Sequence, residues 1–138
     1  MDDIPRNEVE QLIAEMHAGV LRPEDFARRL LNLQVFMPVR DDKHAIRGFQ
    51  TSTRAEPLVV EDEEGQRVLI LFSAPERAKA FLAQFEGYSG GILTEFSWVL
   101  RRLGAGMAIA INPGEVLGFD FDPDMVAMVA ALLPEAGE

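Results

Sequence analysis

The chain contains no cysteine and few basic residues. Without cysteine, thiolate nucleophiles, zinc ribbons and iron–sulfur clusters are excluded. Lys and Arg total 13 against 23 Asp and Glu, which gives a formal net charge of −10. Nucleic-acid binding requires a dense positive footprint that displaces counterions, and an acidic surface is repelled by anionic lipids. We therefore expect neither nucleic acid nor membrane as a partner.

Long apolar runs are also missing. No segment approaches the roughly 18 consecutive apolar residues that a membrane span requires. The N-terminal sequence MDDIPRNEVE is acidic and polar, unlike the basic start of a secretory signal. Apolar residues still make up 48% of the 138 positions, enough for one packed core. We expect a single cytoplasmic domain over residues 1–138.

The first third of the chain predicts a helical hairpin. An apolar stripe runs from Asn7 to Met16, and Gly19 is placed to end that helix. Pro23 is placed to open a second helix, whose inward face carries Phe26 and Leu30. Acidic residues on both helices argue against a DNA-reading helix-turn-helix, which would be basic.

Four strands follow from local patterns. Val68–Phe72 is wholly apolar, which indicates a strand near the middle of a sheet, and Leu58–Val60 precedes it across a hairpin turn. Gln34–Val39 alternates in polarity, and Pro38 suggests that this strand lies near an edge or ends there. Met107–Ile111 is a second well-marked strand.

Three helices and one more strand complete the prediction. Ser73 and Glu76 have the spacing of a capping box at the start of one helix. Apolar periodicity predicts a second helix over Leu93–Leu103, and Asp122 is placed to cap a last helix after a short strand at Gly118–Phe121. The expected fold class is α+β: a mixed, mostly antiparallel sheet of four or five strands, with helices packed on it and an N-terminal helical hairpin.

The segment Gly87–Gly91 reads GYSGG and matches the nucleophile motif G-x-S-x-G. That motif requires a strand before the serine and a helix after it, whereas here a helix is expected before it. Both histidines, His17 and His44, precede Ser89, which reverses the hydrolase order, although other orders can build a triad. We interpret the segment as a flexible hinge between helices and assign no catalytic residue.

Acidic clusters do not predict a metal site. Glu61–Glu64 are consecutive, as in a solvated turn, rather than spaced as calcium ligands. Asp120, Asp122 and Asp124 lack the glycine and the closing glutamate of a calcium loop, and helix capping explains the last two. We expect no metal and no cofactor.

Two sets of residues are candidates for binding. Trp98 lies roughly 200° from Phe96 around the expected helix, so it covers a second packing surface or, with Tyr88, forms a partner patch. The second set is a candidate anion site. It takes its residues from a basic loop and two polar turns: Arg47, Arg54, Ser73, Asn112 and Gly114. It requires the loop and the turns to meet in space; otherwise the loop at 41–56 is a solvated connection.

Three motifs recur in this order in a known family. They are the helix end FARRLL at 26–31 before the strand VFMP at 35–38, FSAPE at 72–76, and AIAINPG at 108–114. With them the chain resembles the SseB N-terminal domain family, named for enhanced serine sensitivity, and the resemblance implies a domain core at about 19–133. Ser73 and Ala74 stand where that family tends to have threonine and serine, so the capping role is kept and the second hydroxyl is lost. The resemblance implies a small cytoplasmic bacterial α+β domain with no established catalytic residues to transfer.

Three functions remain open at this point. The first is a non-catalytic protein-interaction module that binds a protein partner or associates with itself, because a fold without a recognisable site favours binding. The alternative is a domain that senses a small carboxylate or phosphate ligand. An enzyme with an unrecognised site is the third, and clustering of His17 or His44 with carboxylates would favour it.

Overall fold

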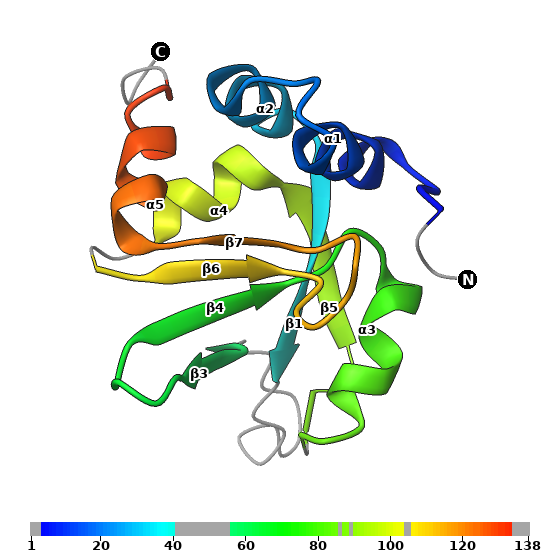
Figure 1. Cartoon of the computed structure of the whole chain (residues 1–138). Coiled ribbons are helices and arrows are strands. Elements are labelled where there is room, and N and C mark those ends of the chain that lie inside the picture. The colour runs from blue at the N-terminus through cyan, green and yellow to red at the C-terminus, as the bar shows by residue number, and fades with distance from the viewer. Residues whose placement is uncertain (1–3, 41–55, 86, 89, 104–105, 134–138) are drawn as a thin grey trace.

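The computed structural model describes residues 4–40, 56–85, 87–88, 90–103 and 106–133 (Figure 1). Its elements are, in order, α1 (Glu8–His17), α2 (Pro23–Leu30), β1 (Gln34–Arg40), β2 (Glu56–Pro57), β3 (Val59–Glu61), β4 (Arg67–Leu71), α3 (Pro75–Leu82), β5 (Gly90–Glu95), α4 (Phe96–Arg102), β6 (Ala108–Ile111), β7 (Phe119–Phe121) and α5 (Pro123–Ala130). The class is α+β, as expected, and α1 and α2 form the expected N-terminal hairpin.

The strands of the described residues form two sheets rather than one. An antiparallel sheet has the order β2-β1-β5, and a mixed sheet has the order β3-β4-β6-β7, in which β4 and β6 are parallel. An isolated bridge joins β1 to the end of β4: the Phe36 N–H donates to the Phe72 carbonyl at 2.7 Å, and the Phe72 N–H donates to the Phe36 carbonyl at 2.9 Å. Beyond this bridge, β1 and β4 diverge into their separate sheets.

The wholly apolar strand is central, as its sequence indicates. β4 lies between β3 and β6, and the hairpin β3–β4 is confirmed. The chain returns from β4 to its parallel neighbour β6 through α3, β5 and α4. Because parallel strands end at the same edge of a sheet, Ser73 after β4 and Asn112 after β6 lie side by side, and the Asn112 N–H donates to the Leu71 carbonyl at 2.9 Å.

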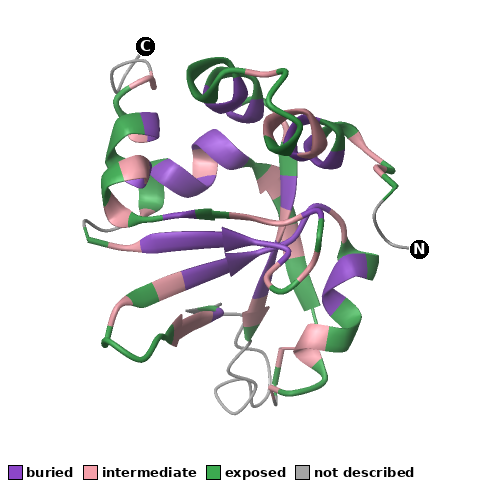
Figure 2. Cartoon of the chain, viewed as in Figure 1, coloured by how far each residue is buried: buried purple, intermediate pink, exposed green. Residues whose placement is uncertain are grey.

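Apolar side chains pack on both faces of the mixed sheet. The larger cluster lies between the sheets and helices α1, α2, α4 and α5, and includes the fully buried Phe26, Phe96 and Phe121. The smaller cluster includes Ile70 and Phe72 on the other face of β4, together with residues of α3. β4 and β6 are accordingly buried along most of their length (purple in Figure 2).

The helix expected over Leu93–Leu103 is wrong in its first part, and so is the glycine hinge before it. Residues 90–95 are strand β5, paired with β1, and the helix begins only at Phe96. The Phe36 ring lies against Gly91, where an added Cβ would be 2.4 Å from Phe36 Cζ. Leu93, expected on the buried stripe, is 54% exposed. Pairing with a distant strand therefore overrides the local helical periodicity.

Pro38 also departs from its expected place. β1 is the middle strand of its sheet, with β2 and β5 on its two sides, and it continues to Arg40. The proline still participates in pairing because its carbonyl accepts the Leu58 N–H at 3.1 Å.

Candidate functional site

The capping box expected at Ser73 is wrong. Helix α3 begins at Pro75, so the N-cap is Ala74, which has no side chain that can cap. The Ser73 hydroxyl instead donates to Glu10 Oε2 at 2.6 Å, and the Ser73 N–H donates to Asn112 Oδ1 at 3.0 Å. Ser73 thus belongs to a buried polar network at the shared end of β4 and β6.

The centre of this network is an ion pair between α1 and α3. Arg77 donates from Nε to Glu10 Oε2 at 2.9 Å and from Nη2 to Glu10 Oε1 at 3.0 Å, a two-pronged contact. The Glu10 side chain is 1% exposed and that of Arg77 7%. Arg77 Nη1 also donates to Glu115 Oε1 at 2.9 Å, so the guanidinium lies between two carboxylates.

Glu10 is held in place by the start of its own helix. Asn7 is the N-cap of α1, and its side-chain oxygen accepts the Glu10 N–H at 2.9 Å. In return, Glu10 Oε1 accepts the Arg6 N–H at 2.9 Å, an arrangement close to a capping box. The same carboxylate therefore caps α1 and serves as the counterion of Arg77.

Asn112 closes the network on the side of β6. It is fully buried and has a φ of 52°, a left-handed conformation that asparagine tolerates better than most residues. Its amide nitrogen donates to Ser73 Oγ and to the Leu117 carbonyl, both at 2.9 Å. The expected turn at 112–114 is present, with Gly114 at a φ of 81°. Within the described residues, every buried side-chain N or O atom has a hydrogen-bond partner.

Both members of the ion pair stay charged. Burial by itself raises the pKa of Glu10, but hydrogen bonds from Arg77, Ser73 and the Arg6 N–H outweigh it and lower the pKa to about 2. The hydrogen bond to Glu10 raises the pKa of Arg77 despite its burial. A carboxylate with so low a pKa is a weak base, so it is poorly suited to take the Ser73 proton.

The ion pair should make stability sensitive to acid. The pKa of Glu10 is about 2 in the folded chain against an ordinary 4.5, so its contribution of about 3 kcal/mol is complete above about pH 4.5 and is lost as the pH falls toward about 2. We expect the stability difference between the wild type and Glu10→Gln, measured by urea unfolding, to shrink by about 2 kcal/mol from about pH 5 to about pH 3. A constant difference would contradict the lowered pKa.

The structure brings together part of the expected anion site. Ser73 and Asn112 are hydrogen-bonded, and Gly114 lies on the same turn. Arg47 and Arg54 lie outside the described residues, as does most of the loop at 41–56. The anion that the Ser73 hydroxyl contacts is the chain's own Glu10 carboxylate.

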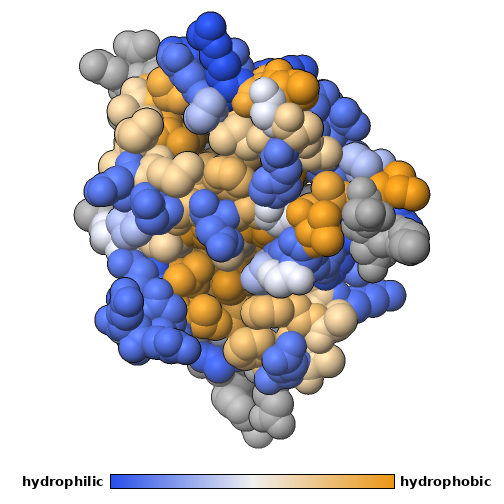
Figure 3. Space-filling view, in the orientation of Figure 1, coloured by the Kyte–Doolittle hydropathy of each residue, from blue (hydrophilic) through white to orange (hydrophobic). Residues whose placement is uncertain are grey.

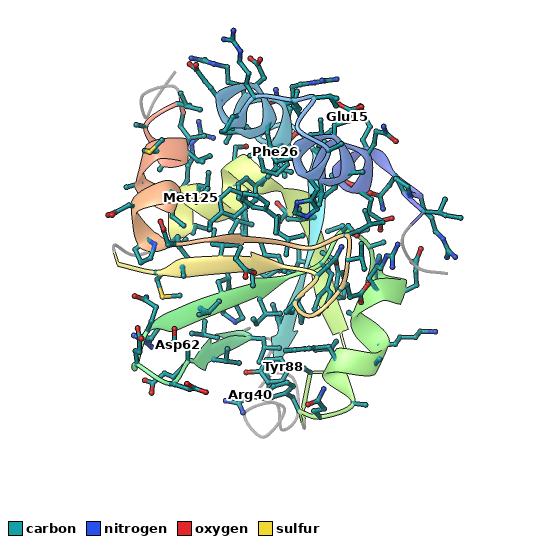
Figure 4. All side chains as sticks on the ribbon, in the orientation of Figure 1. Glu15, Phe26, Arg40, Asp62, Tyr88 and Met125 are labelled. Atoms are coloured by element: carbon teal, nitrogen blue, oxygen red, sulfur yellow. The ribbon has the colours of Figure 1, made fainter. Side chains whose placement is uncertain are left out.

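The residues of the expected partner patch lie in different clusters. Tyr88 packs edge-on against Phe85, and Arg40 Cζ lies 5.5 Å from its ring centroid (Figure 4). Trp98 lies on α4, packs against the larger core cluster and stacks with Arg102. The structure therefore gives each aromatic residue a separate environment.

A family model for the SseB protein N-terminal domain matches residues 9–128. The chain belongs to the SseB family. The match begins within α1, and so it covers Glu10 as well as Arg77 and Asn112. A search of curated proteins finds no match to the chain. None of the helices in the described part of the SseB domain is long and apolar enough to cross a membrane.

His17 is the described residue of the SseB domain that most resembles a proton-transfer group. With Glu115 and Asp120 it lines a hollow of about 310 Å³ beside the buried network, but among the described residues neither carboxylate is hydrogen-bonded or ion-paired to His17. Its Nε2 lies 2.8 Å from the Gly118 carbonyl and donates to it, while Glu115 accepts from Arg77. No three metal-ligating side chains gather in the described residues. His44 and Ser89 lie outside those residues, and strand β5 begins at Gly90, within the G-x-S-x-G segment, where a nucleophile motif would lead into a helix.

Sequence reasoning missed Glu10 and Arg77. The sequence Asn7-Glu8-Val9-Glu10 has the spacing of a capping motif, which could have singled out Glu10. Arg77 carries no comparable signal because its partner lies 67 residues away in sequence. The hydrogen bonds and the ion pair of this network join α1 and α3 to the ends of β4 and β6, so they stabilise the fold.

Proposed function

We propose that this SseB domain is a non-catalytic protein-interaction module that binds its partner through the outer face of α5. The observation that carries the proposal is the composition of that face. Ala127, Met128 and Ala131 are exposed there, Met128 by 68%, and after Asp124 the helix carries no charged side chain. A helix that is apolar all round is normally buried, so a partner is expected to cover it.

Helix α2, which lies beside α5, has the opposite character. Its inward face buries Phe26 and Leu30, whereas Glu24 and Arg28 form an exposed ion pair at 2.9 Å on its outer face. This is the usual pattern of a helix that faces water. In Figure 3 apolar residues gather over α5, next to the hydrophilic outer face of α2. The contrast supports the assignment of the binding face to α5.

A groove between the two helices extends this face. It encloses about 560 Å³, and its lining includes Met16, Phe26, Met125, Met128 and Leu132. Phe26 and Met125 are labelled in Figure 4. Methionine side chains are flexible and polarizable, so they adapt to apolar partners. Grooves of this kind receive the apolar face of a partner helix.

The non-catalytic part of the proposal rests on the chemistry of the network. The Ser73 hydroxyl donates to a carboxylate whose pKa is lowered, and His17 donates to a backbone carbonyl. Such a weak base does not activate the Ser73 hydroxyl, because activation requires a base that accepts its proton, and among the described residues no hydroxyl side chain is hydrogen-bonded to His17.

The variant Met128→Glu tests the proposed face. A glutamate buried against an apolar partner is strongly unfavourable, so we expect at least about tenfold weaker association with an unchanged free energy of unfolding. Association is measured by quantitative capture from lysate of the native host and by sedimentation velocity of the purified chain, which detects self-association. Val116→Glu is the matched control because Val116 is 70% exposed and lies on the β6–β7 loop, away from α5.

Loss of one stoichiometric partner, or of self-association, in Met128→Glu alone would support the proposal. It fails if the wild type remains monomeric and both variants capture the same proteins as the wild type. Equal losses in Met128→Glu and Val116→Glu would also contradict it, because they would show a non-specific effect of added charge.

A further inference from the structure

A second cleft opens where the two sheets separate. The Phe36–Phe72 bridge fixes β1 to β4, and beyond it Leu58 still spans the sheets, because its N–H donates to Pro38 and its carbonyl accepts the Ile70 N–H. Farther along, the core-facing sides of β1 and β4 lie apart, and α4 covers the space between them. The cleft lies between β1, β4, β5 and α4, whose apolar side chains pack in the same core cluster.

The cleft has the size and lining of a small-molecule site. It encloses about 560 Å³, within the roughly 300–1,000 Å³ of typical ligand pockets. Its apolar wall includes Met37, Leu69, Ile92, Val99 and Leu103. Such a wall favours a ligand with an aliphatic or aromatic body.

Two positive charges stand at this cleft in an otherwise acidic protein. Arg67 of β4 and Arg102 of α4 belong to its lining, which contains no Asp or Glu among the described residues. Neither arginine forms an ion pair with another described residue, although Glu61 is the register partner of Arg67. In a chain whose formal net charge is −10, the two arginines make the cleft a place where an anion is attracted rather than repelled.

Trp98 holds Arg102 in a geometry suited to an anion. The Arg102 Cζ lies 3.9 Å from the centroid of the Trp98 ring, and Nη1 lies 3.5 Å from the Trp98 carbonyl. A guanidinium stacked by its face keeps donors along its edge, and stacking reduces the side-chain freedom that would be lost on binding. Those edge donors match the two oxygens of a carboxylate.

We propose that this cleft binds a free small molecule with an apolar body and one anionic head group of the carboxylate type. The body lies against the apolar wall, and the head group contacts Arg102 and Arg67. This site is separate from the α5 face, because the two sets of lining residues share no member among the described residues. It therefore stands or falls independently of the protein-interaction function.

Decanoate is a suitable probe because it has an aliphatic body and a carboxylate. Trp98 is the only tryptophan in the chain and lines the cleft, so its fluorescence reports on the site directly. We expect decanoate, titrated below its micelle-forming concentration, to change this fluorescence saturably with one molecule bound per chain. Decanol and decylammonium, of equal length, should bind at least about tenfold more weakly because they lack the charge that pairs with arginine.

Arg102→Gln should weaken decanoate binding by about tenfold or more, because a hydrogen bond to a charged group is lost. Arg101→Gln is the matched control. Arg101 is the neighbouring arginine of α4 and is exposed, as Arg102 is, but it is not among the described residues that line the cleft. Arg67→Gln, which leaves the stacked Trp98–Arg102 pair intact, should also weaken binding. Calorimetry repeats each titration without relying on Trp98.

The proposal is overturned if decanoate gives neither a fluorescence change nor heat at millimolar concentration. Equal binding of decanoate and decanol would overturn the assignment of the head group. Equal effects of Arg101→Gln and Arg102→Gln would show surface attraction instead of a site at the cleft.

Discussion

Replacing Arg77 with methionine should lower the free energy of unfolding by about 3–5 kcal/mol, because removal of one partner leaves a buried charge without compensation. The charge left unpaired is that of Glu10, whose side chain is 1% exposed and accepts two of the Arg77 hydrogen bonds. Methionine retains the length of the arginine stem, so the expected loss comes from charge and hydrogen bonds more than from packing. Urea unfolding at neutral pH measures it.

An exposed ion pair of the same length provides the control for this prediction. Arg28 and Glu24 are 2.9 Å apart on α2, but their side chains are 55% and 65% exposed. Arg28→Met should therefore change the free energy of unfolding by less than about 1 kcal/mol. Similar losses in Arg28→Met and Arg77→Met would show that burial of the Glu10–Arg77 pair does not determine its importance.

A double variant separates the buried charge from the pair itself. If the cost of Arg77→Met is the unpaired Glu10 carboxylate, then Glu10→Gln combined with Arg77→Met should be clearly less destabilising than the sum of the two single changes. Additive losses would instead indicate that each side chain acts alone.

The elements that follow from the sequence are those whose signals are local. The apolar run at Val68–Phe72, the alternation ending at Ile111 and the Asp122-Pro123 start of α5 each identify their element, and the structure has all three. Each of these patterns depends on residues that are close together in the chain, so the sequence alone is enough to predict the element.

Strand β5 shows where local reasoning ends. The apolar spacing of Leu93, Phe96 and Leu100 fits one helix, yet Leu93 lies on a strand that pairs with β1. The register places Leu93 opposite Phe36, from a segment far away in sequence. Helical periodicity near a strand-to-helix junction is ambiguous because the decisive interactions are non-local.

In the candidate site, too, one part follows from local sequence patterns and another depends on tertiary packing. Ser73 and Asn112 could be expected to meet, because both follow apolar strands that proved to be parallel neighbours. The sequence does not reveal that Glu10 would supply the anion there, since α1 reaches the sheet edge only through tertiary packing. The hydroxyl expected to cap a helix consequently binds a distant carboxylate.

Replacing Asn112 with alanine should cost about 3–8 kcal/mol of stability, from two separate causes. The change leaves the buried Ser73 N–H and the Leu117 carbonyl without their partner, at about 1–3 kcal/mol each. It also places alanine at a φ of 52°, where a left-handed conformation costs about 1–2 kcal/mol. Urea unfolding of the folded variant measures the sum.

Asn112→Gly distinguishes the two causes, since glycine adopts positive φ freely but likewise lacks the amide. We expect it to be about 1 kcal/mol more stable than Asn112→Ala and still well below the wild type. Equal stability of the two variants would remove the backbone contribution. If both variants lost less than about 1 kcal/mol of unfolding free energy, the buried network itself would be contradicted, because leaving buried polar groups unpaired costs more than that. The asparagine is expected to matter chiefly through its amide, which joins the ends of β4 and β6 to the turn that leads into β7.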